Sequence, residues 1–140
     1  MKKIKSLLLA CLLAVSAFTL SVSAALPENT VQPLWDNTFD VVLSHDSIGT
    51  TAHCCVDIGL YSGATMKNAS VRLIAMSENP QRIVKEWTNP TFTLGGNNTY
   101  SFYETVSGIV NGNIYRLVFQ CEVWRNGTCD YISQGLNAIY

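Results

Sequence analysis

Residues 51–61 read TAHCCVDIGLY, and apolar and polar side chains alternate along them. Because the side chains of a β-strand change face at every residue, this period of two predicts a strand with one buried face. The apolar set, which we expect to face inward, consists of Ala52, Cys54, Val56, Ile58 and Leu60. The opposite, outward set consists of Thr51, His53, Cys55 and Asp57. A slip of one residue would expose the whole apolar set, so the register of this strand is strongly specified.

The same period of two recurs towards the C-terminus, at residues 115–124. Its inward set consists of Tyr115, Leu117, Phe119, Cys121 and Val123. Its outward set consists of Arg116, Gln120, Glu122 and Trp124. Matching inward pairs on other strands are Val41 and Leu43, Val71 and Leu73, and Tyr100 and Phe102. Together these side chains predict a single small apolar core.

Short runs of β-branched and aromatic residues continue from Asn37 almost to the C-terminus, and no stretch has a helical period. We expect strands at residues 38–45, 51–61, 69–77, 83–88, 92–94 continuing through 99–106, 113–124 and 129–136. Turn-forming residues separate these runs, among them Asn111-Gly112 and Asn126-Gly127. This spacing predicts an all-β fold, a two-sheet sandwich of about seven antiparallel strands.

The first residues of the chain carry a different pattern. Lys2, Lys3 and Lys5 form a positive region, residues 7–20 are apolar, and Val22-Ser23-Ala24 is a small-residue cleavage site. This layout predicts a cleaved secretory signal peptide at residues 1–24, followed by an N-terminal lead segment at 25–36 and the sandwich domain at 37–140. We therefore expect a secreted protein, extracellular or associated with the cell wall, in a compartment that permits disulfides.

Charge and hydropathy exclude two classes of partner. Removal of the signal takes away three lysines and no acid, so the formal net charge falls from -1 to -4. We expect no binding to nucleic acid, because neutralising phosphates requires clustered Lys and Arg. No apolar segment after the signal approaches the roughly 20 residues that span a bilayer, so we also expect no membrane anchoring after cleavage.

Three features carry a resemblance to a known group of proteins. Inward cysteines lie on an early strand and on the penultimate strand, residues 111–117 read NGNIYRL, and residues 31–35 read VQPLW. Over residues 31–136 the chain resembles small exported immunoglobulin-like or fibronectin type III-like sandwich proteins of Gram-positive bacteria. The resemblance implies an immunoglobulin-like arrangement of the two sheets. These relatives are uncharacterised, so the resemblance implies no activity.

Four cysteines follow the signal: Cys54, Cys55, Cys121 and Cys129. The strands of Cys54 and Cys121 face each other in an immunoglobulin-like sandwich, so the resemblance implies a disulfide between them. Cys55 and Cys129 face outward, and a second disulfide between them requires both to lie near one end of the sandwich. Zinc is the competing interpretation, but paired zinc-binding cysteines are usually two to four residues apart. We expect no metal and no cofactor.

The best candidate for ligand binding is an aromatic surface on the last predicted hairpin. If Asn126-Gly127 is a two-residue turn, Trp124 lies opposite Cys129 and Tyr131 lies opposite Glu122, all on the outer face. Gln120, Glu122 and Ser133 would lie beside the two rings. Such a surface suits a carbohydrate or a protein partner, because rigid aromatic rings lose little conformational entropy on binding. The alternative is that the two rings only strengthen cross-strand pairing.

Catalysis has few candidate residues. The two histidines are His45 and His53, and a hairpin turning at Ile48-Gly49 would place His53 across from Ser44 and near Asp46. A short exposed hairpin supplies neither a pocket nor an oxyanion hole, so we expect no enzymatic activity. We therefore expect a non-enzymatic binding or surface-interaction module. The alternatives are a secreted hydrolase or hydrolase inhibitor that uses the histidine loops, and a structural subunit that assembles through an edge strand.

Three asparagines match the N-glycosylation pattern: Asn68, Asn97 and Asn126. We interpret them as turn residues, because the signal is of a bacterial type and because asparagine tolerates the left-handed backbone that tight turns require.

Overall fold

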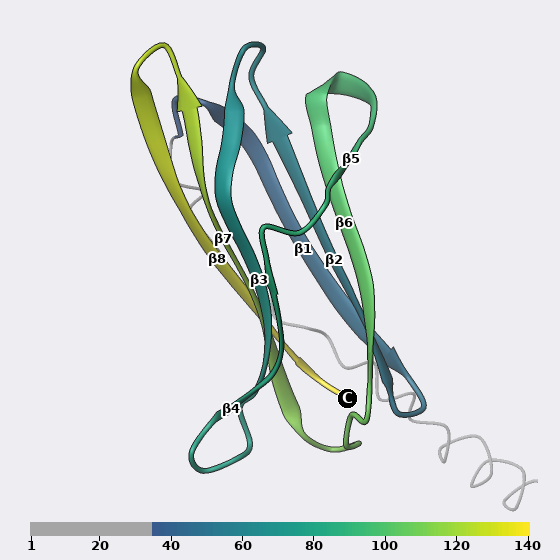
Figure 1. Cartoon of the computed structure of the whole chain (residues 1–140). Helices are drawn as coiled ribbons and strands as arrows, with labels where there is room; N and C mark the ends of the chain where they lie inside the picture. Colours follow the sequence, from purple (N-terminus) through teal and green to yellow (C-terminus); the bar gives the residue numbers. More distant parts are fainter. Residues whose placement is uncertain (1–34) are drawn as a thin grey trace, which may run out of the picture. The chain divides into compact units, whose positions relative to one another are not determined.

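A computed structural model describes residues 35–140 of the chain, so the predicted signal peptide and most of the lead segment, with the VQPLW stretch, lie largely outside the described residues. The strands are β1 (Thr38–Ile48), β2 (Thr51–Leu60), β3 (Thr65–Ala75), β4 (Arg82–Thr88), β5 (Thr93–Leu94), β6 (Thr99–Ser107), β7 (Ile114–Arg125) and β8 (Thr128–Ile139). One short 3-10 helix, η1 (Gly96–Asn98), separates β5 from β6. Figure 1 shows the path of the chain through these elements. In this part of the chain no helix is long and apolar enough to cross a membrane.

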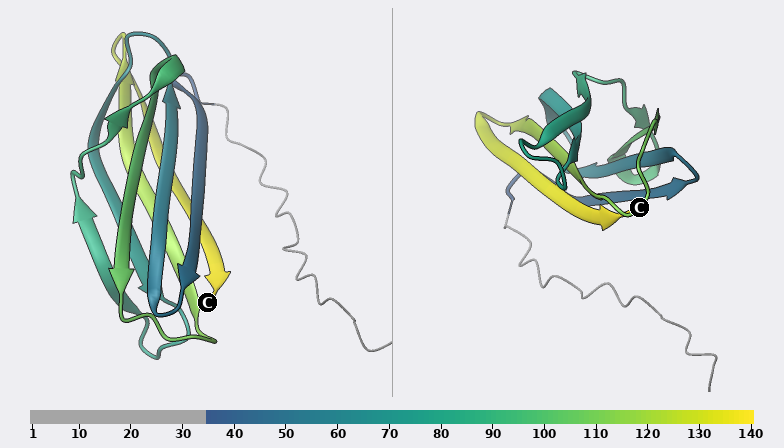
Figure 2. Two further views of the ribbon diagram at one scale, coloured as in Figure 1. Left: turned by 90° about the vertical axis from the view of Figure 1, so that its right-hand side faces the viewer. Right: turned by 90° about the horizontal axis from the view of Figure 1, so that it is seen from below.

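The strands form two antiparallel sheets of four strands each. The first sheet has the order β1-β2-β6-β5 and the second has the order β4-β3-β7-β8. The two sheets lie face to face, as the views in Figure 2 show. The predicted all-β sandwich is confirmed. Among the described residues there are eight strands instead of the expected seven, because η1 interrupts the run that we predicted as one strand through residues 92–106.

The core consists of the side chains that the alternation placed inward. Both inward sets, on β2 and on β7, are buried along their whole length. Phe119 packs between the sheets at 5.9 Å from the ring of Phe92. Tyr115 is buried at the other end of β7, where its hydroxyl accepts a hydrogen bond from the backbone N–H of Val110 at 3.0 Å. The period of two therefore identified the buried face of both strands correctly.

Asparagine takes the turn positions that need a left-handed backbone. Asn126 and Gly127 have φ values of 50° and 82°, so they form the two-residue turn that closes the hairpin of β7 and β8. Asn68 and Asn97 also have positive φ, at 51° and 54°. This backbone is the one that the turn interpretation of these asparagines requires.

The side of the sandwich where β1 lies next to β8 is tied at both ends. At one end the amide nitrogen of the buried Asn37 side chain donates to the carbonyl oxygens of Val123 (3.1 Å) and Thr128 (3.3 Å), and its backbone N–H donates to Asp130 (2.7 Å). At the other end His45 Nε2 donates to the carbonyl oxygen of Leu136 at 2.8 Å. These bonds join the edge of the first sheet to the edge of the second.

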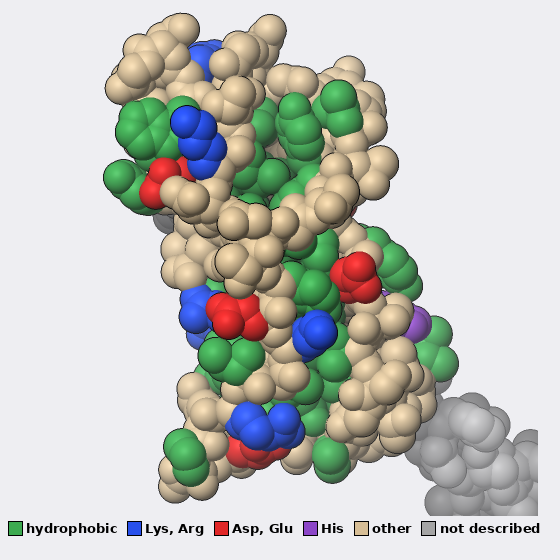
Figure 3. All heavy atoms as spheres, viewed as in Figure 1, with side chains coloured by type: hydrophobic (Ala, Val, Ile, Leu, Met, Phe, Trp, Pro, Cys, Tyr) green, Lys and Arg blue, Asp and Glu red, His purple; other side chains and the backbone are tan. Residues whose placement is uncertain are grey.

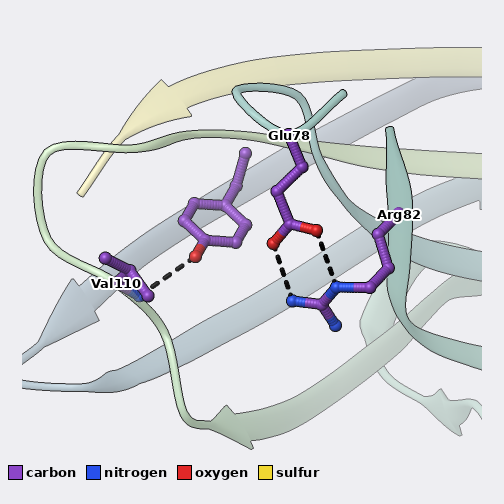
Figure 4. A network of polar contacts seen from close by, with 4 residues as sticks. Glu78, Arg82 and Val110 are labelled. Carbon is purple, nitrogen blue, oxygen red and sulfur yellow. Dashed lines mark hydrogen bonds and ion pairs between the residues drawn. The ribbon is translucent and has the colours of Figure 1, made fainter. Parts of the chain in front are cut away.

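An ion pair spans the loop between β3 and β4. Arg82 donates from two nitrogens to the two carboxylate oxygens of Glu78, at 2.7 and 2.8 Å. Figure 4 shows this pair beside the hydrogen bond made by Val110. Both contacts lie at the end of the sandwich opposite the Asn126-Gly127 turn, because the β3 residue Ala75 pairs with Tyr115 at the start of β7.

Candidate functional site

The hairpin of β7 and β8 has the predicted register. Trp124 pairs with Cys129, Glu122 pairs with Tyr131, and Gln120 pairs with Ser133. Their neighbours Cys121, Val123 and Ile132 are buried, so this row points away from the core. We call the outward row near the turn the aromatic face; it consists of Gln120, Glu122, Trp124, Tyr131 and Ser133.

Trp124 is held in place from two sides. Its indole N–H donates to Glu122 Oε2 at 2.9 Å. The ammonium nitrogen of Lys67 lies 5.8 Å from the centroid of the indole ring, within the range of a cation–π contact. The ring therefore has a fixed orientation and a cation close to it. The alternation pattern did not predict Lys67 at this site.

The alternation pattern did not place Lys67 on the outer face because β3 contains a bulge. Lys67 pairs with Glu122 and Ser70 pairs with Gln120, so both Asn68 and Ala69 lie opposite Cys121. Counting back from the predicted start of the strand at Ala69, strict alternation would point Lys67 into the core. The extra residue reverses that parity and turns Lys67 outward. The only signal in the sequence was Asn68, a residue type that tolerates the positive φ it has here.

Tyr131 is the most exposed large hydrophobic side chain of the described residues, at 75%. It stands on β8 opposite Glu122, next to the pair formed by Glu122 and Trp124. Tyr131 thus offers an open ring beside a fixed one, which is the arrangement that suits a flat ligand.

Gln120 and Ser133 belong to a polar network that continues across the second sheet. The Gln120 side-chain nitrogen donates to Ser133 Oγ at 3.2 Å, and its oxygen accepts from Arg72 Nη2 on β3. Arg72 Nε in turn lies 3.9 Å from a Glu86 carboxylate oxygen on β4. These contacts use one of the two N–H donors of the Gln120 amide and one of the two lone pairs of its oxygen, so the side chain is held in place and keeps one donor and one acceptor position for a ligand.

A third cation borders the aromatic face. The guanidinium of Arg116 lies against Gly135, where a Cβ atom would come within 2.6 Å of Arg116 Nε. Gly135 on β8 therefore leaves the room that this side chain occupies. Lys67, Arg72 and Arg116 bring positive charge to the outer face of the second sheet, beside the carboxylates of Glu86 and Glu122.

The predicted disulfide between Cys54 and Cys121 is not formed: all four cysteines of the described residues are free thiols. Both side chains point inward as expected, but they lie at different heights. Cys54 pairs with His45, which bonds to Leu136, and Leu136 pairs with Leu117, four residues before Cys121. Four residues span about 13 Å along a strand and facing sheets lie about 10 Å apart, whereas bridged cysteines have Cα atoms within about 7 Å.

The second disulfide, between Cys55 and Cys129, is not formed either. Cys55 lies on the outer face of the first sheet, opposite Ser44 and Tyr103, and Cys129 lies on the outer face of the second. Burial is the main cause that raises the pKa of both inward thiols, Cys54 and Cys121, to about 12. The cysteines are therefore neutral thiols that pack with their surroundings. No group of three or more potential metal ligands occurs within residues 35–140.

The two histidines lie on opposite faces of the first sheet. His53 points outward and pairs with Asp46, with 3.1 Å between Nδ1 and the carboxylate, while Ser44 pairs with Cys55. The expected position of His53 across from Ser44 was therefore wrong, because the observed partner of His53 lies two residues further along β1. His45 points inward, where its ring nitrogens are used by Leu136 and by the Tyr140 hydroxyl. His53 and Asp46 are therefore in contact and Ser44 lies near them on the same outer face, whereas His45 lies on the opposite face.

Comparisons of this chain with protein-family models, with curated proteins and with solved structures found no match.

Proposed function

We propose that this protein is an exported, non-enzymatic, immunoglobulin-like binding module whose aromatic face holds a carbohydrate of the extracellular space or cell wall. The strand order supports the immunoglobulin-like arrangement, because the two sheets correspond to A-B-E-D and C′-C-F-G. The Tyr115 hydroxyl accepts from the backbone a few residues upstream, as the corner tyrosine of such domains does, but Tyr115 lies six residues before Cys121 and not two. Export is supported by the three-part pattern of residues 1–24.

The observation that carries the proposal is the pairing of a fixed ring with an exposed one. Trp124 is oriented by Glu122 and Lys67, and Tyr131 stands open beside them. A preorganised surface loses less conformational entropy when it binds. Sugar rings stack on aromatic faces and use neighbouring polar groups as hydrogen-bond partners.

The charges around the rings favour a polar ligand over a protein partner. The cores of protein–protein interfaces are depleted of Lys and Glu, whereas here Lys67 and Glu122 contact or pair with the central rings. A sugar can form hydrogen bonds with such groups while they stay partly hydrated. A protein ligand is the competing outcome of the test.

The test is co-sedimentation with insoluble glycans, namely peptidoglycan, chitin and cellulose, using purified protein. We expect retention on at least one glycan, and a loss on the order of tenfold or more in affinity for Tyr131→Ala, since an aromatic residue at the centre of a binding site costs about 2 kcal/mol or more when truncated and about 1.4 kcal/mol is a factor of ten. Tyr103→Ala is the matched control, because Tyr103 is 60% exposed on the outer face of the other sheet.

Retention that is equal in the Tyr131 and Tyr103 variants would place the binding site elsewhere. Absence of retention on every glycan, together with capture of a protein from the extracellular fluid that Tyr131→Ala abolishes, would replace the carbohydrate by a protein ligand. N-terminal sequencing of the secreted material tests export separately, with Ala25 as the expected first residue.

A further inference from the structure

Three of the four sheet edges carry features that prevent pairing with another strand. β4 has a register shift in its pairing with β3 and the charged residues Arg82, Lys85 and Glu86. β1 has a register shift near Thr38, and its edge is tied to the edge of β8 through hydrogen bonds that involve Asn37 and His45. Bulges, charges and coverage are the usual protections of edge strands.

Within the described chain the fourth edge, at β6, has neither a bulge nor a covering strand over most of its length, and its one protection is the charge of Glu104, which points inward. β6 pairs with β2 from Thr99 to Ser107 without any register shift. On its other edge β5 pairs only with Tyr100 and Ser101. Figure 2 shows that β5 lies beside one end of β6 only. Residues 102–107 therefore have no partner strand on this edge within residues 35–140.

The backbone groups that point to this edge can be identified. The carbonyl oxygen of Thr99 accepts a hydrogen bond from Gly95, which lies on the β5 side. Because both polar groups of a residue in an antiparallel strand point the same way and alternate along the strand, the odd-numbered residues face this edge. Tyr103, Thr105 and Ser107 thus present their N–H and C=O groups to the unpaired side.

The side chains confirm that this edge is open. Alternation places Glu104 on the inner face between Phe102 and Val106, and both of these neighbours are buried while Glu104 is exposed. Figure 3 shows hydrophobic side chains between β4 and β6 on this side of the molecule. An inward position that stays exposed is one that no part of the described chain covers.

We propose that two copies of the chain associate through β6, antiparallel, with the two-fold axis at Thr105. In this register Thr105 lies opposite Thr105 of the second copy, and Tyr103 lies opposite Ser107. Each of these odd-numbered pairs exchanges two N–H···O=C bonds, which satisfies all the unpaired groups identified above. The interface is isologous, as expected for a closed dimer.

Competing registers fit less well. Centring the pair on Glu104 would place two like charges directly opposite each other, which is destabilising. Centring it on Tyr103 would place Ser101 in the interface, where β5 already occupies the edge. The register at Thr105 places Glu104 opposite Val106, so the two Glu104 carboxylates are diagonal neighbours and not directly opposite each other, and it uses only the stretch that β5 leaves unpaired. A second copy fits because this stretch is complementary to itself.

Substitutions that introduce charge at the proposed two-fold axis, at Thr105, test the proposal. The purified protein is kept under reducing conditions, because these prevent cross-linking through the half-buried Cys55 and Cys129. Sedimentation velocity from micromolar to millimolar concentration should show a concentration-dependent dimer. Thr105→Asp and Thr105→Lys should each be monomeric, because they place like charges opposite each other, and an equimolar mixture of the two should dimerise again. Thr105 is exposed, so we expect both variants to fold with the parent's circular dichroism spectrum.

Ser44→Asp and Ser44→Lys are the matched controls, because Ser44 is exposed on the same face of the same sheet but on β1. Both should dimerise like the parent. A parent that stays monomeric over the whole range overturns the proposal. So do Thr105 variants that dimerise alone, because the dimer would then use another surface. Restoration by the Asp–Lys mixture cannot come from misfolding, so it keeps the test decisive even if one variant is less stable.

Discussion

His45 on β1 donates its Nε2 proton to the carbonyl oxygen of Leu136 on β8, and its Nδ1 atom meets the hydroxyl of Tyr140. A carbonyl oxygen can only accept, so Nε2 carries the proton and Nδ1 accepts from Tyr140. Tyr140 also stacks on Tyr115, with 5.0 Å between the ring centroids. The neutral imidazole thus connects the edge of one sheet to the C-terminal strand of the other.

Stability should fall as the pH is lowered through the range where His45 is protonated. Burial lowers the pKa of His45 below 6.5, against the opposing effects of its bond to Leu136 and of the Asp46 charge. Above pH 6.5 the imidazole is neutral in both states and its full contribution to stability is present. Below this pH the unfolded chain binds the proton more tightly, so the free energy of unfolding decreases until the pH has passed the folded-state pKa.

Urea unfolding at pH 7.5 and at pH 5 measures this effect. His45→Gln should show a smaller decrease than the parent, because it no longer has the buried imidazole. His53→Gln removes the other imidazole and is the matched control. A decrease that disappears in the His53 variant instead would contradict the assignment to His45.

Asn37→Ala should lower the free energy of unfolding by about 1–3 kcal/mol, because it leaves buried groups of the β7–β8 hairpin without partners. The Asn37 side chain bonds to the carbonyl oxygens of Val123 and Thr128. Asn137→Ala, at an exposed position on β8, should change stability by less than about 0.5 kcal/mol. Chemical denaturation compares the two, and equal losses would show that Asn37 does not tie the edges together.

Two glycines should respond differently to alanine. At Gly59 a Cβ atom would collide with the Phe39 ring, which packs edge-on against Tyr61. We expect Gly59→Ala to cost about 1–3 kcal/mol, the usual range for overpacking. At Gly135 the atoms in the way belong to the flexible end of Arg116, so Gly135→Ala should cost less. Thermal unfolding of both variants gives the order, and the reverse order would contradict it.

The cysteines should fall into two classes of reactivity. Cys54 and Cys121 are buried thiols whose pKa is raised to about 12, so they should resist alkylation of the folded protein. Cys55 and Cys129 are only partly buried and should react first. Mass spectrometry after iodoacetamide treatment at pH 8 counts the modified sites. Protection of Cys54 and Cys121 that is lost only on reduction would instead indicate a disulfide between them.

The buried faces of the strands and the register of the last hairpin could be predicted from the sequence, because alternation and turn chemistry are local properties. The two-residue turn at Asn126-Gly127 sets which residues of β7 and β8 lie opposite each other, so the partners of Trp124 and Tyr131 were predicted correctly. The inward direction of Cys54 and Cys121 followed from alternation in the same way.

What the sequence could not supply is the relative height of strands in different sheets. To predict whether Cys54 and Cys121 can form a disulfide, this relative height must be known. It depends on the bonds from Asn37 and His45 across the edge. The length of the β1–β2 turn also shifted His53 from Ser44 to Asp46. Lys67 was hidden by the bulge at Asn68, because a single added residue reverses the alternation on one side of it.

The bulge at Asn68 determines where a relative of this chain can accept an insertion or a deletion within β3. Deleting this residue would leave Lys67 opposite Glu122 and Ser70 opposite Gln120, so the pairs on both sides would survive. Natural insertions and deletions at this point would therefore change the curvature of β3 without exchanging the side chains that border Trp124. An alignment of relatives should show a gap here more readily than at the positions of β3 where the pairing is regular.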